Sequence, residues 1–232
     1  MDRPFADRRD SGRQLAQRLA AAWGRRDDVV VLALPRGGVP VAFEVAAALR
    51  APLDVLPVCK VGMPWQAELA IGALSSNGAQ YVDRALVREA GISPSQLEDA
   101  IDEARAELAR REARYRPARP ARTAPGSDSP VEALSVAGRV AIVVDDGMAT
   151  GASLKAAVLA LASLRPARIV AALPVAPPDA RGRLGDAVDE FVCVATPPNF
   201  MAVGQFYADF GQTSDDEVRA LLDRAADRPP AR

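Results

Sequence analysis

Residues 140–153 read Val140-Ala141-Ile142-Val143-Val144-Asp145-Asp146-Gly147-Met148-Ala149-Thr150-Gly151-Ala152-Ser153, and this stretch decides the fold. The five apolar residues at its start predict a strand that is buried on both faces, as in the centre of a parallel sheet. A helical pattern begins at about residue 152, so the loop between them leads from a strand into a helix N-terminus. Such a glycine-bounded loop offers backbone N–H groups and a positive helix dipole, which suit an anion and best of all a phosphate.

Two acids, Asp145 and Asp146, stand where this strand ends. Beside a phosphate, paired carboxylates suit the 2′- and 3′-hydroxyls of a ribose, because an ionised carboxylate accepts hydrogen bonds. The alternative is a βα turn with a polar helix cap and no ligand, as in many α/β proteins. We expect both carboxylates to be exposed, so that replacing them leaves the stability of the fold nearly unchanged.

The rest of the chain alternates strand patterns with helical patterns, which predicts an α/β fold with a mostly parallel sheet and helices on its faces. A helix at 10–22 has Leu15, Leu19 and Ala22 on its apolar face. The other predicted strands are 29–34, 53–58, 168–173 and 190–195, and the other helices are 41–49, 152–164, 178–186 and 214–226, the last capped by Thr213 or Ser214. Ligands of such sheets bind outside the carboxyl ends of the strands.

An insertion at about 61–137 interrupts this alternation. Residues 61–82 predict a hairpin or another excursion from the main sheet, and 93–115 predict a helix that begins with a capping box at Ser93 and Gln96. The narrow apolar stripe of this helix must pack either on the sheet or on a second subunit, which would make the protein a homodimer. Residues 116–137 are rich in Pro, Gly and Ser, which predicts an irregular, mobile connection.

The composition excludes several classes of function. A formal net charge of -1 argues against a nucleic-acid partner, and the absence of histidine excludes every site that needs an imidazole. Cys59 and Cys193 lie in apolar runs, so we expect inert core thiols in a reducing compartment. Neither a signal peptide nor a membrane-spanning run is visible, which predicts a cytoplasmic protein with no membrane partner.

Three stretches carry a resemblance to a known family. Residues 143–153 resemble the phosphoribosyl pyrophosphate (PRPP) motif of type I phosphoribosyltransferases, an apolar strand followed by two acids and a short loop through Thr-Gly. Pro35-Arg36-Gly37-Gly38-Val39 resembles the pyrophosphate loop of that family. Lys60, expected at the end of the second strand of the sheet, matches the basic position before the mobile catalytic loop of the family. Residues 60–62, 68–73 and 202–210 resemble a narrower bacterial group of predicted phosphoribosyltransferases without a settled substrate, so that the similarity runs from about Phe5 to Leu222.

The resemblance implies one domain over residues 1–232 with a parallel core sheet flanked by helices, the inserted hairpin and helix region, and a C-terminal hood-like segment. It implies catalytic roles for Asp145 and Asp146, which would hold the ribose hydroxyls, and for Lys60, which would neutralise the leaving pyrophosphate. The residues that it implies for substrate binding are Arg36, Gly37, Gly38, Gly147, Met148, Ala149, Thr150, Gly151, Ala152 and Ser153. Mg²⁺ would be held mainly by the oxygens of PRPP and pyrophosphate, so no protein metal ligand is expected.

Two positions depart from the family pattern. The 6-oxopurine enzymes have an Asp where this chain has Ala149, which argues against hypoxanthine or guanine as acceptor. An arginine commonly precedes the lysine matched to Lys60, and here that position is Cys59, so one phosphate contact is missing.

Three functions remain open at this point. The first is a Mg²⁺-dependent transferase that joins the 5-phosphoribosyl group of PRPP to a nucleobase or a similar small nitrogen acceptor, as in nucleotide salvage. The second is a non-enzymatic PRPP or nucleotide sensor on the same fold. The third is a protein that binds another phosphorylated ribose and cleaves it. Arg36, Lys60 and the two acids favour the first, because a sensor would need only the phosphate loop and the acids.

Overall fold

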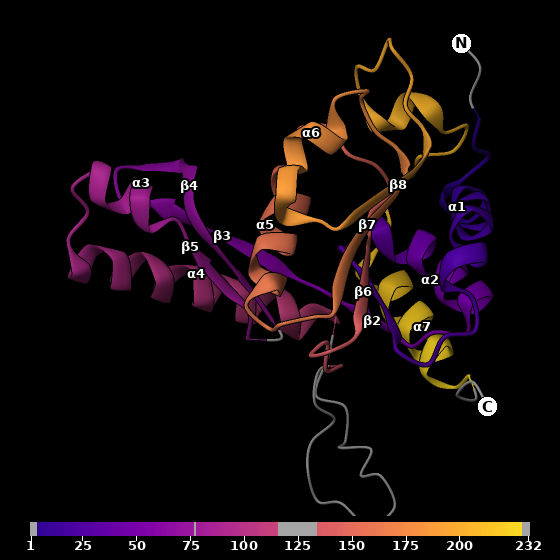
Figure 1. The fold of residues 1–232 in the computed structure, drawn as a ribbon, viewed down its shortest axis with the longest axis horizontal. Coiled ribbons are helices and arrows are strands. Elements are labelled where there is room, and N and C mark those ends of the chain that lie inside the picture. Colours follow the sequence, from indigo (N-terminus) through magenta and orange to yellow (C-terminus); the bar gives the residue numbers. More distant parts are fainter. Residues whose placement is uncertain (1–3, 77, 116–133, 229–232) are drawn as a thin grey trace, which may run out of the picture.

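The computed structural model describes residues 4–76, 78–115 and 134–228. Its centre is a five-stranded parallel sheet in the order β2-β1-β6-β7-β8 (Figure 1). The strands are β1 (Val29–Ala33), β2 (Leu53–Val55), β6 (Val140–Val144), β7 (Arg168–Val175) and β8 (Glu190–Ala195). Every residue of β1 and β6 is buried, as their unbroken apolar sequences predict. The expected α/β fold with a parallel sheet flanked by helices is therefore confirmed.

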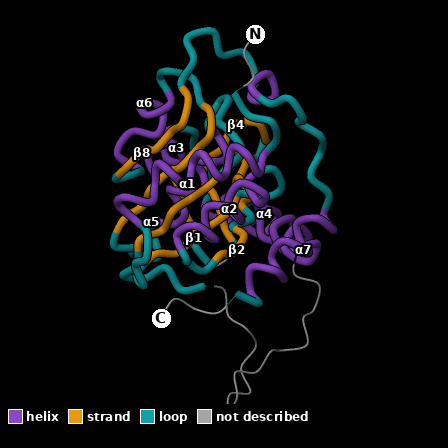
Figure 2. The backbone as a smooth tube through the Cα atoms, turned by 90° about the vertical axis from the view of Figure 1, so that its right-hand side faces the viewer, coloured by secondary structure: helices purple, strands orange, loops and turns teal. Residues whose placement is uncertain are grey.

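Helices cover both faces of this sheet. One face packs against α1 (Arg8–Trp23), α2 (Gly38–Leu49) and α7 (Asp215–Ala226), and the other packs against α5 (Ala152–Ala162) and α6 (Ala180–Leu184), which continues into a short 3-10 helix at Gly185–Ala187. Because side chains alternate along a strand, Val29 and Val31 join the first layer whereas Val30 and Leu32 join the second. Figure 2 shows α1 and α2 side by side in front of the strands.

The inserted region forms a second, antiparallel sheet in the order β3-β4-β5. Its strands are β3 (Val58–Met63), β4 (Gln66–Ser75) and β5 (Gln80–Val82), followed by α3 (Arg84–Glu89) and α4 (Pro94–Tyr115). The apolar stripe of α4 packs on this second sheet, with Ala104 and Leu108 buried. The opposite face contacts α5 through Ala73, Ala79 and Ala160, so the insertion lies against the main domain on that side.

Local signals in the sequence account for most element ends. The capping box of α4 is present, since the Ser93 N–H donates to Oε1 of Gln96 and the Gln96 N–H donates to Oγ of Ser93. Ser214 caps α7 by accepting from the N–H of Glu217. The prediction of an irregular, mobile stretch at 116–137 falls mostly on residues 116–133, which lie outside the described residues.

Two predictions about the elements were wrong. The strand expected at 53–58 is two strands in different sheets, because the chain leaves the parallel sheet after Val55 and starts β3 at Val58. Ala22 is exposed, and Trp23 takes the inward position at the end of α1, since the larger side chain buries more apolar area.

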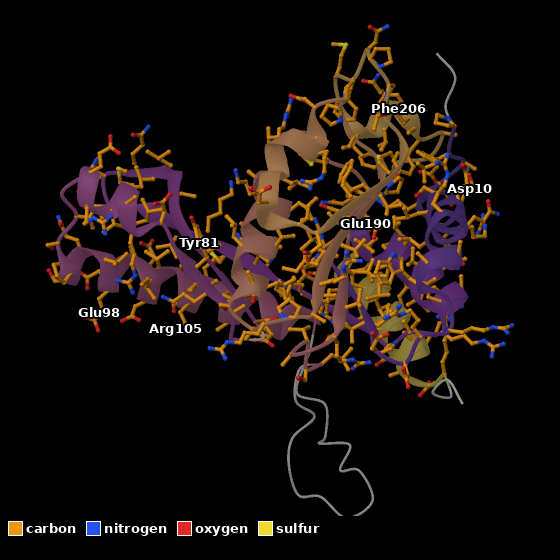
Figure 3. The ribbon with its side chains drawn as sticks, viewed as in Figure 1. Asp10, Tyr81, Glu98, Arg105, Glu190 and Phe206 are labelled. Carbon is orange, nitrogen blue, oxygen red and sulfur yellow. The ribbon has the colours of Figure 1, made fainter. Side chains whose placement is uncertain are left out.

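The N-terminal segment meets the segment between β8 and α7 at the carboxyl end of the sheet. Phe5 forms a parallel bridge with Tyr207, and both pack with Phe206 and with Val175, the last residue of β7. Figure 3 shows Phe206 in the upper part of the molecule and Asp10 of α1 at its right edge. Within the described residues, no helix combines the length and the hydropathy needed to cross a bilayer.

Candidate functional site

The candidate site lies at the carboxyl ends of β1 and β6, which are hydrogen-bonded neighbours with Ala33 opposite Val144. From β1 the chain passes through α2 to β2 on one side, and from β6 it passes through α5 to β7 on the other. The order of the strands therefore reverses between β1 and β6. Open α/β sheets bind ligands in the crevice at this kind of switch point.

The loops that follow these two strands touch each other. A Cβ added to Gly37 would lie 2.0 Å from Oδ2 of Asp146, and one added to Gly38 would lie 2.9 Å from Cα of Asp145 and 2.6 Å from the carbonyl oxygen of Val144. Only glycine leaves room for such an approach. The structure thus brings together the sequence-predicted residues of both loops.

The two acids are half-buried, so the prediction that they are exposed was wrong. The Asp146 side chain is 15% exposed and accepts from Nε of Arg8 at 2.8 Å, and Oδ1 of Asp145 accepts from the N–H of Asp146 at 2.8 Å. Burial and the neighbouring Asp146 carboxylate raise the pKa of Asp145 well above its usual range. Burial also raises the pKa of Asp146, although Arg8 opposes this by favouring the ionised form.

The surroundings of the two acids differ. Asp146 is paired with the guanidinium of Arg8 and is therefore the better candidate for a charged acceptor. Among the described residues, Asp145 has only the N–H of Asp146 as a hydrogen-bond donor.

The loop 147–153 leads from the acids into α5. Gly147 lies under the C-terminal segment, since an added Cβ would meet Cγ1 of Val203 at 2.5 Å. Met148 is buried and donates its N–H to the carbonyl of Val175, and Gly151 adopts a positive φ of 80° as the residue before α5. Loop and helix residues on the outer side are exposed, namely Ala149, Thr150, Ala152 and Ser153. The loop is therefore anchored at its start and open where a phosphate would approach the helix N-terminus.

Arg36 is turned toward α7. Its Nη1 lies 3.8 Å from Oδ1 of Asp215, the first residue of that helix, and the Arg36 side chain is 37% exposed. The peptide bond between Pro35 and Arg36 is cis. Arg36 therefore lies beside the site and is paired with the carboxylate of Asp215.

Lys60 lies on β3 of the second sheet, and not at the end of a strand of the main sheet as the sequence predicted. Cys59 and Val61 pack with α4, so the alternation along the strand turns Lys60 to the other face. Its cross-strand partner Ala73 packs there with Ala160 of α5. Lys60 is exposed on the side of the insertion that faces α5, the helix that begins at the candidate phosphate loop.

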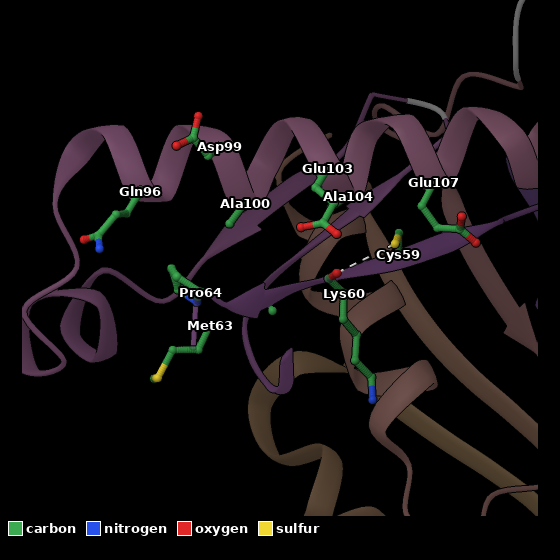
Figure 4. Close-up of a pocket in the computed structure, with 11 residues that line it drawn as sticks. Cys59, Lys60, Met63, Pro64, Gln96, Asp99, Ala100, Glu103, Ala104 and Glu107 are labelled. Carbon is green, nitrogen blue, oxygen red and sulfur yellow. Dashed lines mark hydrogen bonds between the residues drawn. The ribbon is translucent and has the colours of Figure 1, made fainter. Parts of the chain in front are cut away.

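A groove of about 400 Å³ between β3 and α4 is a separate feature (Figure 4). Its polar lining includes the carboxylates of Asp99, Glu103 and Glu107, which would repel an anion. The Lys60 side chain points away from α4 in this view, although its backbone lines the groove. This groove is therefore unsuited to a phosphorylated substrate.

Three residues at the acidic pair were missed by the sequence reasoning. Arg8 binds Asp146, while the hydroxyl of Tyr207 donates to the carbonyl oxygen of Asp146 at 2.6 Å and lies 3.2 Å from Oγ of Ser11. Burial raises the pKa of Tyr207, so this hydroxyl stays protonated and acts as a donor. Arg8 is 138 positions from its partner, and no local pattern connects them.

Metal-binding clusters are absent from the described residues, where no three His, Cys, Asp or Glu side chains lie close enough to hold an ion. The site itself supplies only the two half-buried carboxylates, and one of these is paired with Arg8. An ion at this position would need most of its ligands from a bound phosphate compound or from water.

Comparison with known proteins gives a consistent result. Residues 8–210 match the model of the phosphoribosyl transferase domain family. Two Mycobacterium tuberculosis proteins from different strains, both provisionally named phosphoribosyl transferases, are 47% identical to this chain over 221 residues. The match covers 95% of this chain and 47% of theirs, so the chain spans about half the length of these curated relatives. The crystal structure of the protein TT1426 from Thermus thermophilus superposes with a TM-score of 0.80 at 40% identity, over 96% of this chain and 98% of that one.

Proposed function

The chain belongs to the phosphoribosyltransferase family, and from this premise we propose that it transfers the 5-phosphoribosyl group of PRPP to a small nitrogen acceptor with release of pyrophosphate. One observation carries the proposal. The two strand-end loops that resemble the pyrophosphate loop and the PRPP motif contact each other at the switch point of the sheet, with Gly37 directly against Asp146. A generic βα turn would not require a second glycine loop packed against its acids.

In this proposal the sugar phosphate binds along the loop that follows β6. The N-terminus of α5 and the exposed hydroxyls of Thr150 and Ser153 receive the 5′-phosphate, because N–H groups and a helix dipole favour an anion there. Asp145 and Asp146 take the ribose hydroxyls. The ion pair with Arg8 supports Asp146 as the charged acceptor of the two.

The reaction breaks the bond between the anomeric carbon and the pyrophosphate oxygen and forms a bond from that carbon to the acceptor nitrogen, which loses its proton. Negative charge grows on the departing pyrophosphate, so cations near it lower the barrier. We assign this task to Lys60 and Arg36, with Gly37 and Gly38 giving the pyrophosphate access to the backbone. Such catalysis by positioning and charge needs no imidazole, which agrees with a chain that has no histidine.

Magnesium fits this site only as an ion carried by the substrate. The family generally uses Mg²⁺ with PRPP, and when bound it would neutralise the pyrophosphate oxygens. The described residues supply no cluster that could hold the ion by itself. The two acids would therefore contact it through water, while the chain positions the sugar.

The acceptor is not a 6-oxopurine bound by a carboxylate at position 149. Ala149 is exposed and its carbonyl accepts from Nη1 of Arg183, so this position offers no acid to a base. A different small nitrogen compound is proposed, which acts together with PRPP as the second partner.

A PRPP sensor is the second candidate, and the contact between Arg36 and Asp215 favours it. An arginine that is already paired binds pyrophosphate less strongly, whereas a sensor needs only the phosphate loop and the acids. Homodimer formation and a cytoplasmic location remain predictions, and light scattering in solution measures the first.

The deciding experiment is a screen of nucleobases and amines with PRPP and Mg²⁺ that monitors pyrophosphate release. A transferase releases pyrophosphate only with its acceptor, at a rate that follows the acceptor concentration. Binding of PRPP without release for any acceptor would select the sensor.

A further inference from the structure

The N-terminal helix reaches the candidate site through one side chain, Arg8. Arg8 is the first residue of α1 and its side chain is 13% exposed. Its Nε donates to Oδ2 of Asp146 at 2.8 Å, its Nη1 donates to the carbonyl oxygen of Gly211 at 2.6 Å, and its guanidinium carbon lies 4.0 Å from the ring centre of Phe210. Three separate parts of the guanidinium group are thus fixed.

Asp146 is correspondingly held from three directions. Arg8 holds its carboxylate, Tyr207 holds its carbonyl oxygen, and Gly37 leaves the space that the carboxylate fills. Arg8 lies at the start of α1 and Tyr207 in the segment between β8 and α7, and these two segments also meet at the bridge between Phe5 and Tyr207. The position of Asp146 therefore depends on two segments that are distant from it in the sequence.

We propose that Arg8 is a positioning residue for sugar binding, which fixes the Asp146 carboxylate toward the ribose hydroxyls and couples it to the C-terminal segment at 207–211. The proposal rests on the proposed function, because it assumes that Asp146 receives the sugar. In this role Arg8 acts through Asp146, because its Nε is engaged by that carboxylate and its Nη1 by the carbonyl oxygen of Gly211.

Charge and geometry both explain why an arginine stands here. A buried carboxylate without a counter-ion favours its neutral form, and Arg8 opposes this at Asp146. Lysine could supply the charge, but it lacks the planar group that bonds in two directions and stacks on Phe210 at once. Arg8→Lys should therefore keep part of the effect.

The test uses calorimetric titration of ribose 5-phosphate and of Mg²⁺-pyrophosphate into the same proteins. Losing one charge-assisted contact through Asp146 should weaken ribose 5-phosphate binding by about 10-fold in Arg8→Met. Mg²⁺-pyrophosphate binding should stay within about twofold, because Asp146 would reach this ligand only through water on the Mg²⁺ ion. Arg8→Lys should lie between Arg8→Met and the wild type. Arg13→Met is the matched control, since Arg13 is 55% exposed and pairs only with Asp10 in the described structure.

A double-mutant cycle separates positioning from general damage. In an Asp146→Asn background, Arg8→Met should lower ribose 5-phosphate affinity by no more than about twofold further. Equal losses for both ligands, or full losses in the Asp146→Asn background, would overturn the positioning role. If the wild type binds PRPP and ribose 5-phosphate but Arg8→Met and Arg8→Lys bind them equally well, this inference alone fails. If the wild type binds neither, the proposed function fails and the inference falls with it.

Discussion

Gly37→Ala is the substitution that tests most sharply whether the two strand-end loops form one site. Gly37 has φ −58° and ψ −33°, a helical conformation that alanine adopts without strain. Its new Cβ would nevertheless lie 2.0 Å from Oδ2 and 2.6 Å from Cγ of Asp146. Because nonbonded carbon atoms do not approach below about 3 Å, the carboxylate must move by about 1 Å. Oδ2 is the atom that Arg8 binds, so this movement breaks their hydrogen bond.

The cost follows from these contacts. A hydrogen bond to a charged group contributes about 1.5–3 kcal/mol, and the loss of glycine entropy from the unfolded chain returns about 0.4–1 kcal/mol. The net loss of about 1–2 kcal/mol should lower the Tm by about 2–8 °C for a chain of this size. Ribose 5-phosphate affinity should fall by about 10-fold as Asp146 leaves its position.

Gly182→Ala is the matched control, because an added Cβ there meets nothing within 4 Å and the residue lies in α6. Its Tm should stay equal or rise slightly, since alanine favours a helix over glycine by up to about 1 kcal/mol. Thermal melts and calorimetry on both variants make the comparison. A Gly37→Ala protein that melts and binds as the wild type does would refute the contact between the loops.

Three further predictions concern the acids, the phosphate loop and the lysine. Burial and the neighbouring Asp146 carboxylate raise the pKa of Asp145, so the protein should lose stability as the pH rises from the unfolded carboxyl pKa of about 3.9 toward the raised folded value. Asp145→Asn should flatten this loss and raise the Tm at neutral pH, which thermal melts across that pH range measure. Gly151→Ala and Gly138→Ala both force alanine to a positive φ, of 80° and 68°, at a cost of about 1–2 kcal/mol, and the new Cβ at position 151 also meets Cε of Met148 at 2.3 Å. Only Gly151→Ala should also weaken ribose 5-phosphate binding, by about 10-fold in calorimetry. Lys60→Gln should weaken Mg²⁺-pyrophosphate binding by about 10-fold with little change in Tm, whereas Arg105→Gln, on the exposed side of α4, should change neither quantity. If both variants changed pyrophosphate affinity equally, Lys60 would not belong to the site.

Features that depend only on neighbouring residues in the sequence could be predicted. The apolar run before Asp145 correctly predicted a central strand, and the glycine loop correctly predicted a helix that starts at about Ala152. The capping box correctly predicted the start of α4. In each case neighbours in the sequence are also neighbours in space. The rule for parallel sheets placed the glycine loop after β1 and the acids after β6 at the same edge of the sheet, whereas their direct contact came from the structure.

Features made by distant residues could not be predicted. Nothing near Arg8 indicates that it pairs with a carboxylate 138 positions away, and the burial of Asp145 and Asp146 depends on that packing. The boundary between β2 and β3 was missed because two apolar strands joined by Leu56 and Pro57 form one continuous apolar pattern. Apolar patterns report burial, and they do not report which sheet a strand joins.

In the proposed function, the acids and the loop after β6 bind the sugar phosphate of PRPP. The most direct measurement is calorimetric titration of PRPP with Mg²⁺ into the wild type and into the double variant Asp145→Asn and Asp146→Asn, with melting curves to confirm folding. We expect the wild type to bind and the double variant to lose at least about 10-fold in affinity, less than the sum of the single losses, because both acids serve one ribose. Unchanged affinity in a folded double variant would contradict the account, and the acidic pair would then be a structural turn.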